Sequence, residues 1–140
     1  MDIEKMSKHT FSTKIRVRYS ETDKMGFCYY GNYATYFEVA RVEALRDLGI
    51  VYKKLEENGI LLPVTELNIR YKRAAKYDDL LEIKTVITKT EGTRISFSYE
   101  TWGEDGTLLN EADTTLVFVD ANSMKPIPIP TFIQNAIPHE

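Results

Sequence analysis

Residues 19–45 read YSETDKMGFCYYGNYATYFEVARVEAL, and this stretch decides the fold of the chain. Residues 20–32 are rich in glycine and small polar side chains, which is typical of a loop. In residues 33–48 apolar side chains recur at helical spacing, at Tyr33, Phe37, Ala40, Ala44 and Leu48. This spacing predicts a helix, and because Tyr36 and Leu45 widen the apolar stripe, we expect most of the helix to be buried.

The two ends of this predicted helix carry residues that favour helix termini. Asn32 precedes the helix and is a good N-cap, and Gly49 stands where a C-terminal cap belongs. Glu38 and Arg41 lie three positions apart on the expected polar face, where an ion pair is the default interpretation.

Downstream of the helix the apolar period changes. Residues 51–57 predict a second short helix that ends at Asn58-Gly59. From residue 63 onward apolar and polar side chains alternate with a period of two, which indicates strands. The predicted strands are residues 63–71, 81–87, 95–101 and 108–119, with one more at residues 14–19 before the helix. Asp105-Gly106 predicts a hairpin whose two turn residues both have positive φ.

The order strand, long helix, short helix and four strands predicts one α+β domain with an antiparallel sheet. A single buried helix has to be covered, so we expect the sheet to curl around it. No repeat or linker divides residues 1–140, and the core is expected to span about residues 11–120. In the tail, residues 121–140, Pro126, Pro128 and Pro130 favour an extended backbone, and residues 131–137 predict one helical turn.

The composition is that of an ordinary globular protein, with 43% hydrophobic and 28% charged residues. A net charge of −3 argues against nucleic acid as a partner, because nucleic-acid-binding proteins usually carry a basic excess. No apolar run reaches the length of a membrane span, and residues 1–13 lack the apolar core of a signal peptide. We therefore expect a cytoplasmic protein that binds neither nucleic acid nor a membrane.

Histidine and cysteine are scarce, and this limits the possible chemistry. The two histidines, His9 and His139, lie near the chain ends. A Ser-His-Asp triad, a Cys-His pair and most zinc sites need an imidazole within the fold, so all three are disfavoured. Cys28 is the only cysteine and has no base near it, which predicts a small buried hydrophobe. Carboxylates, tyrosine, lysine, backbone dipoles or a bound cofactor remain.

Residues 19–45 resemble the signature of the 4-hydroxybenzoyl-CoA thioesterase branch of the hot-dog superfamily, which includes the short acyl-CoA thioesterases found beside bacterial envelope genes. The matching features are Thr22-Asp23, Gly26, Tyr30 and the Asn32-Tyr33 start of the helix. The helical run FEVARVEAL and the downstream block YKRAAKYDDLLEI also match, so the similarity spans roughly residues 11–120. The resemblance implies a hot-dog fold, in which a curved antiparallel sheet wraps one long central helix.

The same resemblance implies acyl-CoA thioesterase activity without a metal or redox cofactor, with CoA as part of the substrate. In this family the aspartate that matches Asp23 is the catalytic carboxylate, as nucleophile or as general base, and the thioester carbonyl lies at the start of the central helix. Backbone N–H groups at a helix start have no internal partners, so they stabilise an oxyanion. We expect Asp23 and Tyr30 in catalysis, with Tyr30 acting through its backbone N–H or its hydroxyl. Many members of the bacterial acyl-CoA branch have histidine at this position, whereas the 4-hydroxybenzoyl-CoA type has tyrosine.

Seven further residues are expected to bind the substrate. These are Gly26, Gly31, Asn32, Tyr33, Arg70, Lys72 and Arg73, of which the last three would hold the CoA phosphates. Each has a structural alternative, because glycines and asparagine are common in turns and caps and basic residues are common at solvated strand ends. Glu43 is a weaker candidate for the catalytic carboxylate, since some other hot-dog thioesterases use a helical glutamate.

Two other functions remain open. An acyl-ACP thioesterase would use the same site, with the basic residues 70–76 facing an acidic carrier protein. A non-catalytic acyl-CoA-binding hot-dog protein would bind the ester without turnover. The family implies a homodimer whose sites form at the subunit interface, with a homotetramer as the alternative.

Overall fold

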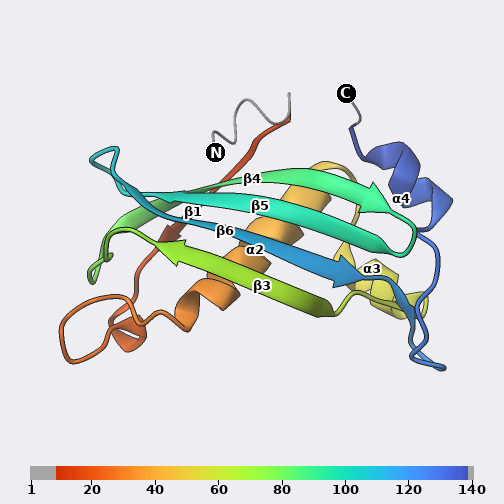
Figure 1. Ribbon diagram of the computed structural model, residues 1–140, viewed down its shortest axis with the longest axis horizontal. Helices are drawn as coiled ribbons and strands as arrows, with labels where there is room; N and C mark the ends of the chain where they lie inside the picture. Colours follow the sequence, from red (N-terminus) through yellow and green to blue (C-terminus); the bar gives the residue numbers. More distant parts are fainter. Residues whose placement is uncertain (1–8, 139–140) are drawn as a thin grey trace.

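A five-stranded antiparallel sheet in the order β1-β4-β5-β6-β3 forms the main layer of the molecule (Figure 1). The strands are β1 (Phe11–Arg16), β3 (Val64–Tyr71), β4 (Leu80–Glu91), β5 (Arg94–Trp102) and β6 (Leu108–Val117). Two short strands, β2 (Ile60–Leu61) and β7 (Val119–Asp120), pair separately. The computed structural model describes residues 9–138, so the expectations for residues 1–8 and for His139 lie outside the described residues.

Helix α2 (Asn32–Asp47) packs against one face of the sheet. A 3-10 turn, η1 (Tyr19–Glu21), precedes it, and α3 (Tyr52–Glu57) follows. Helix α4 (Thr131–Ala136) lies at the opposite end of the sheet from the loop that enters α2 (Figure 1). The expected tail thus contributes to the core, because Ile129, Ile133 and Ile137 are buried.

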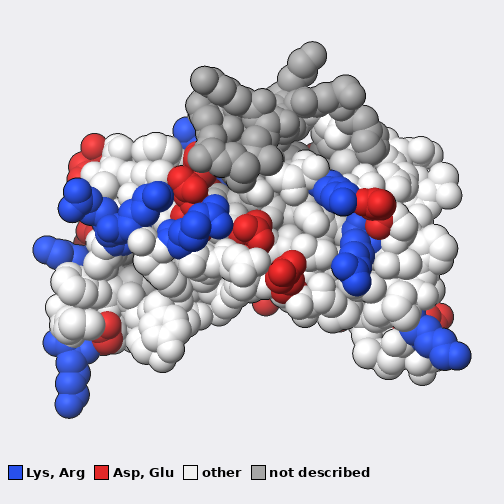
Figure 2. Space-filling model, in the orientation of Figure 1, with Lys and Arg blue, Asp and Glu red and all other residues white. Residues whose placement is uncertain are grey.

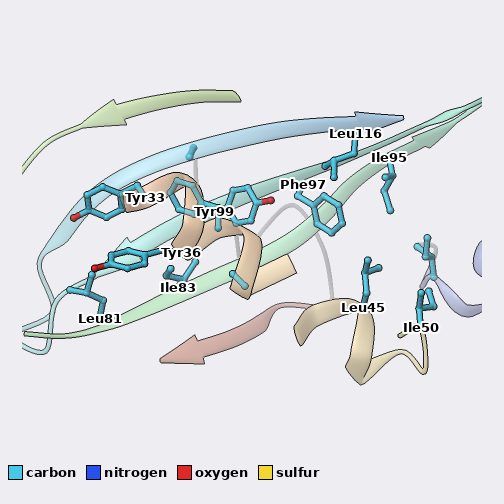
Figure 3. Packing of buried hydrophobic residues seen from close by; sticks show 14 of the residues in the cluster. Tyr33, Tyr36, Leu45, Ile50, Leu81, Ile83, Ile95, Phe97, Tyr99 and Leu116 are labelled. Atoms are coloured by element: carbon cyan, nitrogen blue, oxygen red, sulfur yellow. The ribbon is translucent and has the colours of Figure 1, made fainter. Parts of the chain in front are cut away.

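The core lies between α2 and the sheet and is rich in aromatic rings (Figure 3). Phe37 of α2 stacks on Tyr99 of β5 with ring centroids 4.6 Å apart, and Phe97 continues the stack at 6.3 Å from Tyr99. Each fully buried side chain of this size contributes about 1.5–3 kcal/mol. The predicted α+β architecture, with a sheet covering one long buried helix, is confirmed.

Three local predictions were wrong. Asn32 is the first residue of α2 and Gly31 takes the N-cap position, because the Asn32 side chain donates to the Glu21 carbonyl oxygen instead. In the Asp105-Gly106 hairpin only Gly106 has positive φ, since the connection is longer than two residues and closes between Gly103 and Thr107. Arg41 lies on the buried side of α2, 6% exposed, rather than on the polar face beside Glu38.

Candidate active site

Asp23 lies in a tight turn between η1 and α2. Its backbone N–H donates to the Phe27 carbonyl oxygen at 2.9 Å, and its carbonyl accepts from the Gly26 N–H at 3.0 Å. The Asp23 carboxylate oxygen Oδ1 accepts from the backbone N–H groups of Met25 (2.9 Å) and Phe27 (3.2 Å). Gly26 permits this turn because its φ of +80° is a conformation that side chains disfavour. Both donors use Oδ1, so Oδ2 stays available to a substrate.

The loop that carries Asp23 is fixed at both ends. The Cys28 N–H donates to the Ala75 carbonyl at 2.8 Å, which joins the loop to the segment after β3. Thr22 and Cys28 form an isolated antiparallel bridge across the base of the loop, so the Asp23 turn is a small closed hairpin. Cys28 is buried as expected, and burial raises the pKa of its thiol.

Glu21 is the main anchor of this loop and is only 7% exposed. Its carboxylate accepts from the Arg18 N–H (2.8 Å), from the Arg18 guanidinium (2.8 and 3.2 Å) and from the Tyr36 hydroxyl (2.8 Å). Its backbone carbonyl accepts from the Tyr29 N–H at 2.8 Å and from Asn32 Nδ2 at 2.7 Å. Although burial opposes ionisation, these donors hold the pKa of Glu21 below its usual value. The charged side chain therefore ties η1, the loop and α2 together.

Of the four backbone N–H groups of residues 30–33 at the start of α2, two have acceptors among the described residues and two do not. The Asn32 and Tyr33 N–H groups donate to the carbonyls of Tyr29 (3.0 Å) and Tyr30 (3.2 Å). The N–H groups of Tyr30 and Gly31 find no acceptor among residues 9–138. A Cβ at Gly31 would come within 2.9 Å of the Tyr29 ring, so a side chain there would have to displace that ring. Two neighbouring free donors thus stand at the positive end of a 16-residue helix.

A cavity of about 360 Å³ lies between this loop, the start of α2 and the end of β3. Its lining residues are Asp23, Met25, Phe27, Cys28, Tyr30, Tyr33, Tyr71, Lys72, Arg73 and Ala74. The Tyr71 hydroxyl donates to the Tyr30 carbonyl at 3.3 Å, and its ring meets the Tyr33 ring edge-on at 5.8 Å. Burial raises the pKa of Tyr33 and of Tyr71, so both hydroxyls are neutral at pH 7.

The basic residues do not all reach this cavity. Lys72 and Arg73 line it, whereas Arg70 lies on the outer face of the sheet and pairs with Glu111 (3.4 Å) and Asp113 (3.8 Å). Arg73 also lines an adjoining groove of about 540 Å³ whose rim carries acidic as well as basic side chains. Figure 2 shows this mixed character on the outer face, where basic side chains gather toward the end at which β3 ends but alternate with acidic ones.

Most of the predicted site residues are therefore brought together. Asp23, Tyr30, Tyr33, Lys72 and Arg73 line one cavity. Gly26 and Gly31 shape the loop beside it, and Asn32 anchors that loop. Arg70 lies apart, and so does Glu43, which is exposed on α2 and pairs with Arg46 at 3.4 Å.

Three residues of the site were not predicted as part of it: Glu21, Tyr36 and Tyr71. Glu21 and Tyr36 make the hydrogen bonds that hold the loop, and Tyr71 comes from a strand distant in sequence. The one feature of the sequence that could have indicated such a residue is the position of Glu21, an acidic residue two positions before Asp23.

Two further structural findings bear on function. Among residues 9–138 no group of three or more histidine, cysteine, aspartate or glutamate side chains is placed to hold a metal ion. Within that same range no helix is both long and apolar enough to cross a membrane.

Comparison with known proteins finds thioesterases by sequence and by structure. Residues 17–137 match the family model described as the thioesterase-like superfamily. The putative acyl-CoA thioesterase YneP of Bacillus subtilis is 36% identical over 85% of this chain and 86% of its own length. The acyl-CoA thioester hydrolase YbgC of Escherichia coli is 35% identical over 91% of this chain and 96% of its own. The structure of the DHNA-CoA thioesterase from Staphylococcus aureus has a TM-score of 0.86 and 39% identity, over 90% of this chain and 85% of that one.

Proposed function

The chain belongs to the thioesterase-like superfamily, has the hot-dog fold and is an acyl-CoA thioesterase, and we propose that Asp23 is its catalytic carboxylate. The observation that carries the proposal is the meeting of three features at one cavity. These are the Asp23 carboxylate with its Oδ2 free, the free N–H groups of Tyr30, which lines the cavity, and of its neighbour Gly31, and the positive end of α2.

The proposed reaction needs a carboxylate and two backbone donors. Asp23 Oδ2 either attacks the thioester carbon or takes a proton from the water that attacks it. The carbonyl oxygen becomes an oxyanion, which accepts hydrogen bonds from the Tyr30 and Gly31 N–H groups. Collapse of the tetrahedral intermediate breaks the carbon–sulfur bond, and CoA departs as a thiolate. When water is the nucleophile this step releases the free acid, and when Asp23 is the nucleophile it leaves a mixed anhydride that a water molecule then hydrolyses to the acid and the Asp23 carboxylate. A thiolate is a good leaving group, so no histidine is required as a general acid.

The turn fixes the orientation of the Asp23 carboxylate. Because Oδ1 is held by the Met25 and Phe27 N–H groups, the carboxylate cannot rotate freely, and Oδ2 keeps one direction. Pre-organisation of this kind avoids the entropy cost of positioning the catalytic group at each turnover.

Replacement of Asp23 by asparagine tests the assignment. The asparagine Oδ1 still accepts from both backbone N–H groups, so the loop stays folded while the negative charge and the base are lost. We expect hydrolysis of acyl-CoA esters, followed as thiol release, to fall by at least ~10²-fold with an unchanged melting temperature. Glu43→Gln is the matched control and should keep full activity. Near wild-type turnover by Asp23→Asn would refute the catalytic role.

The cationic side of the cavity supports binding of the CoA phosphates. Lys72 and Arg73 are exposed at its rim, so they are available to a phosphorylated ligand. We expect Arg73→Ala to raise KM for acyl-CoA about tenfold while kcat changes little, because this interaction is lost equally in ground and transition states. Arg70→Ala, whose side chain lies on the other face, should leave KM unchanged. An equal rise in KM in both variants would indicate that the substrate responds only to the overall positive charge of this surface, and not to a contact with Arg73.

The carrier of the acyl group separates this function from its nearest alternative. An acyl-ACP thioesterase would use the same carboxylate and donors, so parallel kinetics on matched acyl-CoA and acyl-ACP esters decide between them. Tight acyl-CoA binding without turnover would instead identify a binding protein. The proposed location is the cytoplasm, which cell fractionation tests.

A homodimer assembled through β3 is part of the proposal. This strand is an edge of the sheet, and its apolar side chains Val64, Leu67 and Tyr71 are 44%, 38% and 48% exposed. Long apolar edge strands are rare in monomers because their unpaired backbone recruits another chain. Tyr71 belongs to both this edge and the cavity, so a second copy paired along β3 would cover the mouth of the site.

A further inference from the structure

Asn110, in β6, is the one residue among residues 9–138 with two buried side-chain polar atoms that lack a hydrogen-bond partner. Its side chain is 0% exposed, yet neither Nδ2 nor Oδ1 has a hydrogen-bond partner among residues 9–138. Some other polar groups facing the helix are paired, such as the Tyr99 hydroxyl with Thr114 Oγ1 at 2.7 Å, whereas within the same residues the hydroxyls of Thr85 and Thr101 are not. Burying a whole amide without partners is costly, and such groups in native proteins call for a functional explanation.

A second unpartnered group lies directly beside Asn110. Thr101 of β5 is opposite Asn110 in the sheet and is also 0% exposed, and its Oγ1 has no partner within the described part of the chain. Side chains of directly opposed residues share one face and have Cβ atoms roughly 5 Å apart. The amide and the hydroxyl therefore form one buried polar pair with unused hydrogen-bonding capacity.

This pair lies behind the wall of the cavity. On its other side Asn110 is opposite Tyr71 of β3, so Thr101, Asn110 and Tyr71 form a single row across three strands, which Figure 1 shows as neighbours. Tyr71 lines the cavity and is 48% exposed, and its ring packs edge-on against Tyr33. Tyr71 thus stands between the cavity and Asn110, and a rotation of its half-exposed side chain is needed to join the two.

We propose that Asn110 and Thr101 form the inner end of the acyl pocket and select an acyl group that carries a hydroxyl or carbonyl substituent. An amide has two donors and an acceptor, and a threonine hydroxyl is both, so together they match a substrate hydroxyl. An unsubstituted acyl group would leave these buried groups unpaired, and a site of this kind discriminates strongly against the analogue that lacks the polar group. The inference rests on the thioesterase function proposed above and adds its substrate class.

The test compares selectivity in matched variants. The probes are monohydroxybenzoyl-CoA isomers against benzoyl-CoA, and 3-hydroxybutyryl-CoA against butyryl-CoA, each followed as thiol release. The measured quantity is the ratio of kcat/KM for the best hydroxylated ester to that for its parent. Asn110→Leu removes the polar atoms at similar volume, and Thr101→Val does so almost isosterically. Thr85→Val is the control, because Thr85 is equally buried and its Oγ1 is also without a partner in the described residues, but it lies one row away, opposite Tyr99.

We expect wild type and Thr85→Val to prefer a hydroxylated ester, and Asn110→Leu and Thr101→Val to lose that preference by about tenfold or more. We also expect Asn110→Leu to melt roughly 3 °C higher, because the unpaired amide destabilises the empty protein. An unchanged ratio in both variants alongside active enzyme would overturn this inference and leave the thioesterase function intact. That result would mean that a trapped water satisfies the pair. A wild type that hydrolyses none of the esters would overturn the proposed function and this inference with it.

Discussion

Removal of the Tyr36 hydroxyl offers a quantitative test of the anchor that holds the Asp23 loop. In Tyr36→Phe the ring keeps its place in the core, where it is 2% exposed, but the 2.8 Å hydrogen bond to Glu21 Oε1 is lost. A hydrogen bond to a charged group contributes about 1.5–3 kcal/mol. Glu21 keeps its three donors from Arg18, so the carboxylate is not orphaned, and we expect a loss near the lower end, ~1.5 kcal/mol.

The expected change in melting temperature follows from the chain length. For 140 residues the entropy of unfolding is about 0.29 kcal/mol/K, so ~1.5 kcal/mol lowers Tm by roughly 5 °C. The measurement is urea unfolding and calorimetry at one fixed protomer concentration, beside Tyr77→Phe as control, because Tyr77 is 55% exposed. We also expect Tyr36→Phe to lower kcat, since the loop loses one of its hydrogen-bonded connections to α2 and keeps that from Asn32. A destabilisation below ~0.5 kcal/mol, the scatter of ordinary surface changes, would refute the anchoring role.

Two further predictions concern the same loop and the sheet edge. Because hydrogen bonding lowers the pKa of folded Glu21, its contribution to stability is present above the unfolded pKa and is lost as pH falls through the folded one. We therefore expect the free energy of unfolding to fall less steeply at acid pH in Glu21→Gln than in the wild type. An unchanged pH dependence would contradict the proposed role of the hydrogen bonds from Arg18 and Tyr36 to Glu21. Leu67→Lys, on the β3 edge, should yield monomers by sedimentation and lower activity, whereas Phe132→Lys on α4 should not; a wild-type monomer would exclude the dimer.

The fold was largely predictable because its signals are local and periodic. The apolar stripe of residues 33–48 and the alternating runs that follow placed the long helix and the main strands to within a few residues. The short pair of β2 and β7 escaped prediction, since two-residue strands carry no period. The position of Arg41 was misjudged for a different reason. Its guanidinium lies near the hydroxyls of Tyr99 and Tyr52, and those partners come from elements that sequence spacing cannot bring together.

The candidate site was predictable only where its residues lie in one continuous motif. Asp23, Gly26, Tyr30 and Tyr33 fall within eleven consecutive positions. In the structure Asp23, Tyr30 and Tyr33 line one cavity, and Gly26 forms the turn beside it. Tyr71 and Asn110 reach the same region through the register of β3 with β6, which depends on long-range pairing. Arg70 shows the converse, because it is adjacent to Tyr71 in sequence but alternation along a strand turns it to the opposite face.

The hydrogen bonds around the loop explain how a domain without an internal histidine can hold a carboxylate ready for catalysis. A histidine-based site relies on side-chain partners to orient its base, whereas here the orientation comes from two backbone N–H groups that donate hydrogen bonds to Asp23 Oδ1. These two hydrogen bonds depend on the turn, and the turn depends on the bridge between Thr22 and Cys28. The segment follows Glu21 directly in the chain, and at its far end the Tyr29 N–H donates to the Glu21 carbonyl. The same Glu21 carbonyl binds Asn32, so the carboxylate and the free donors at the helix start share one anchor. Loss of that anchor should therefore displace the base and the oxyanion donors together, and lower kcat more than it raises KM.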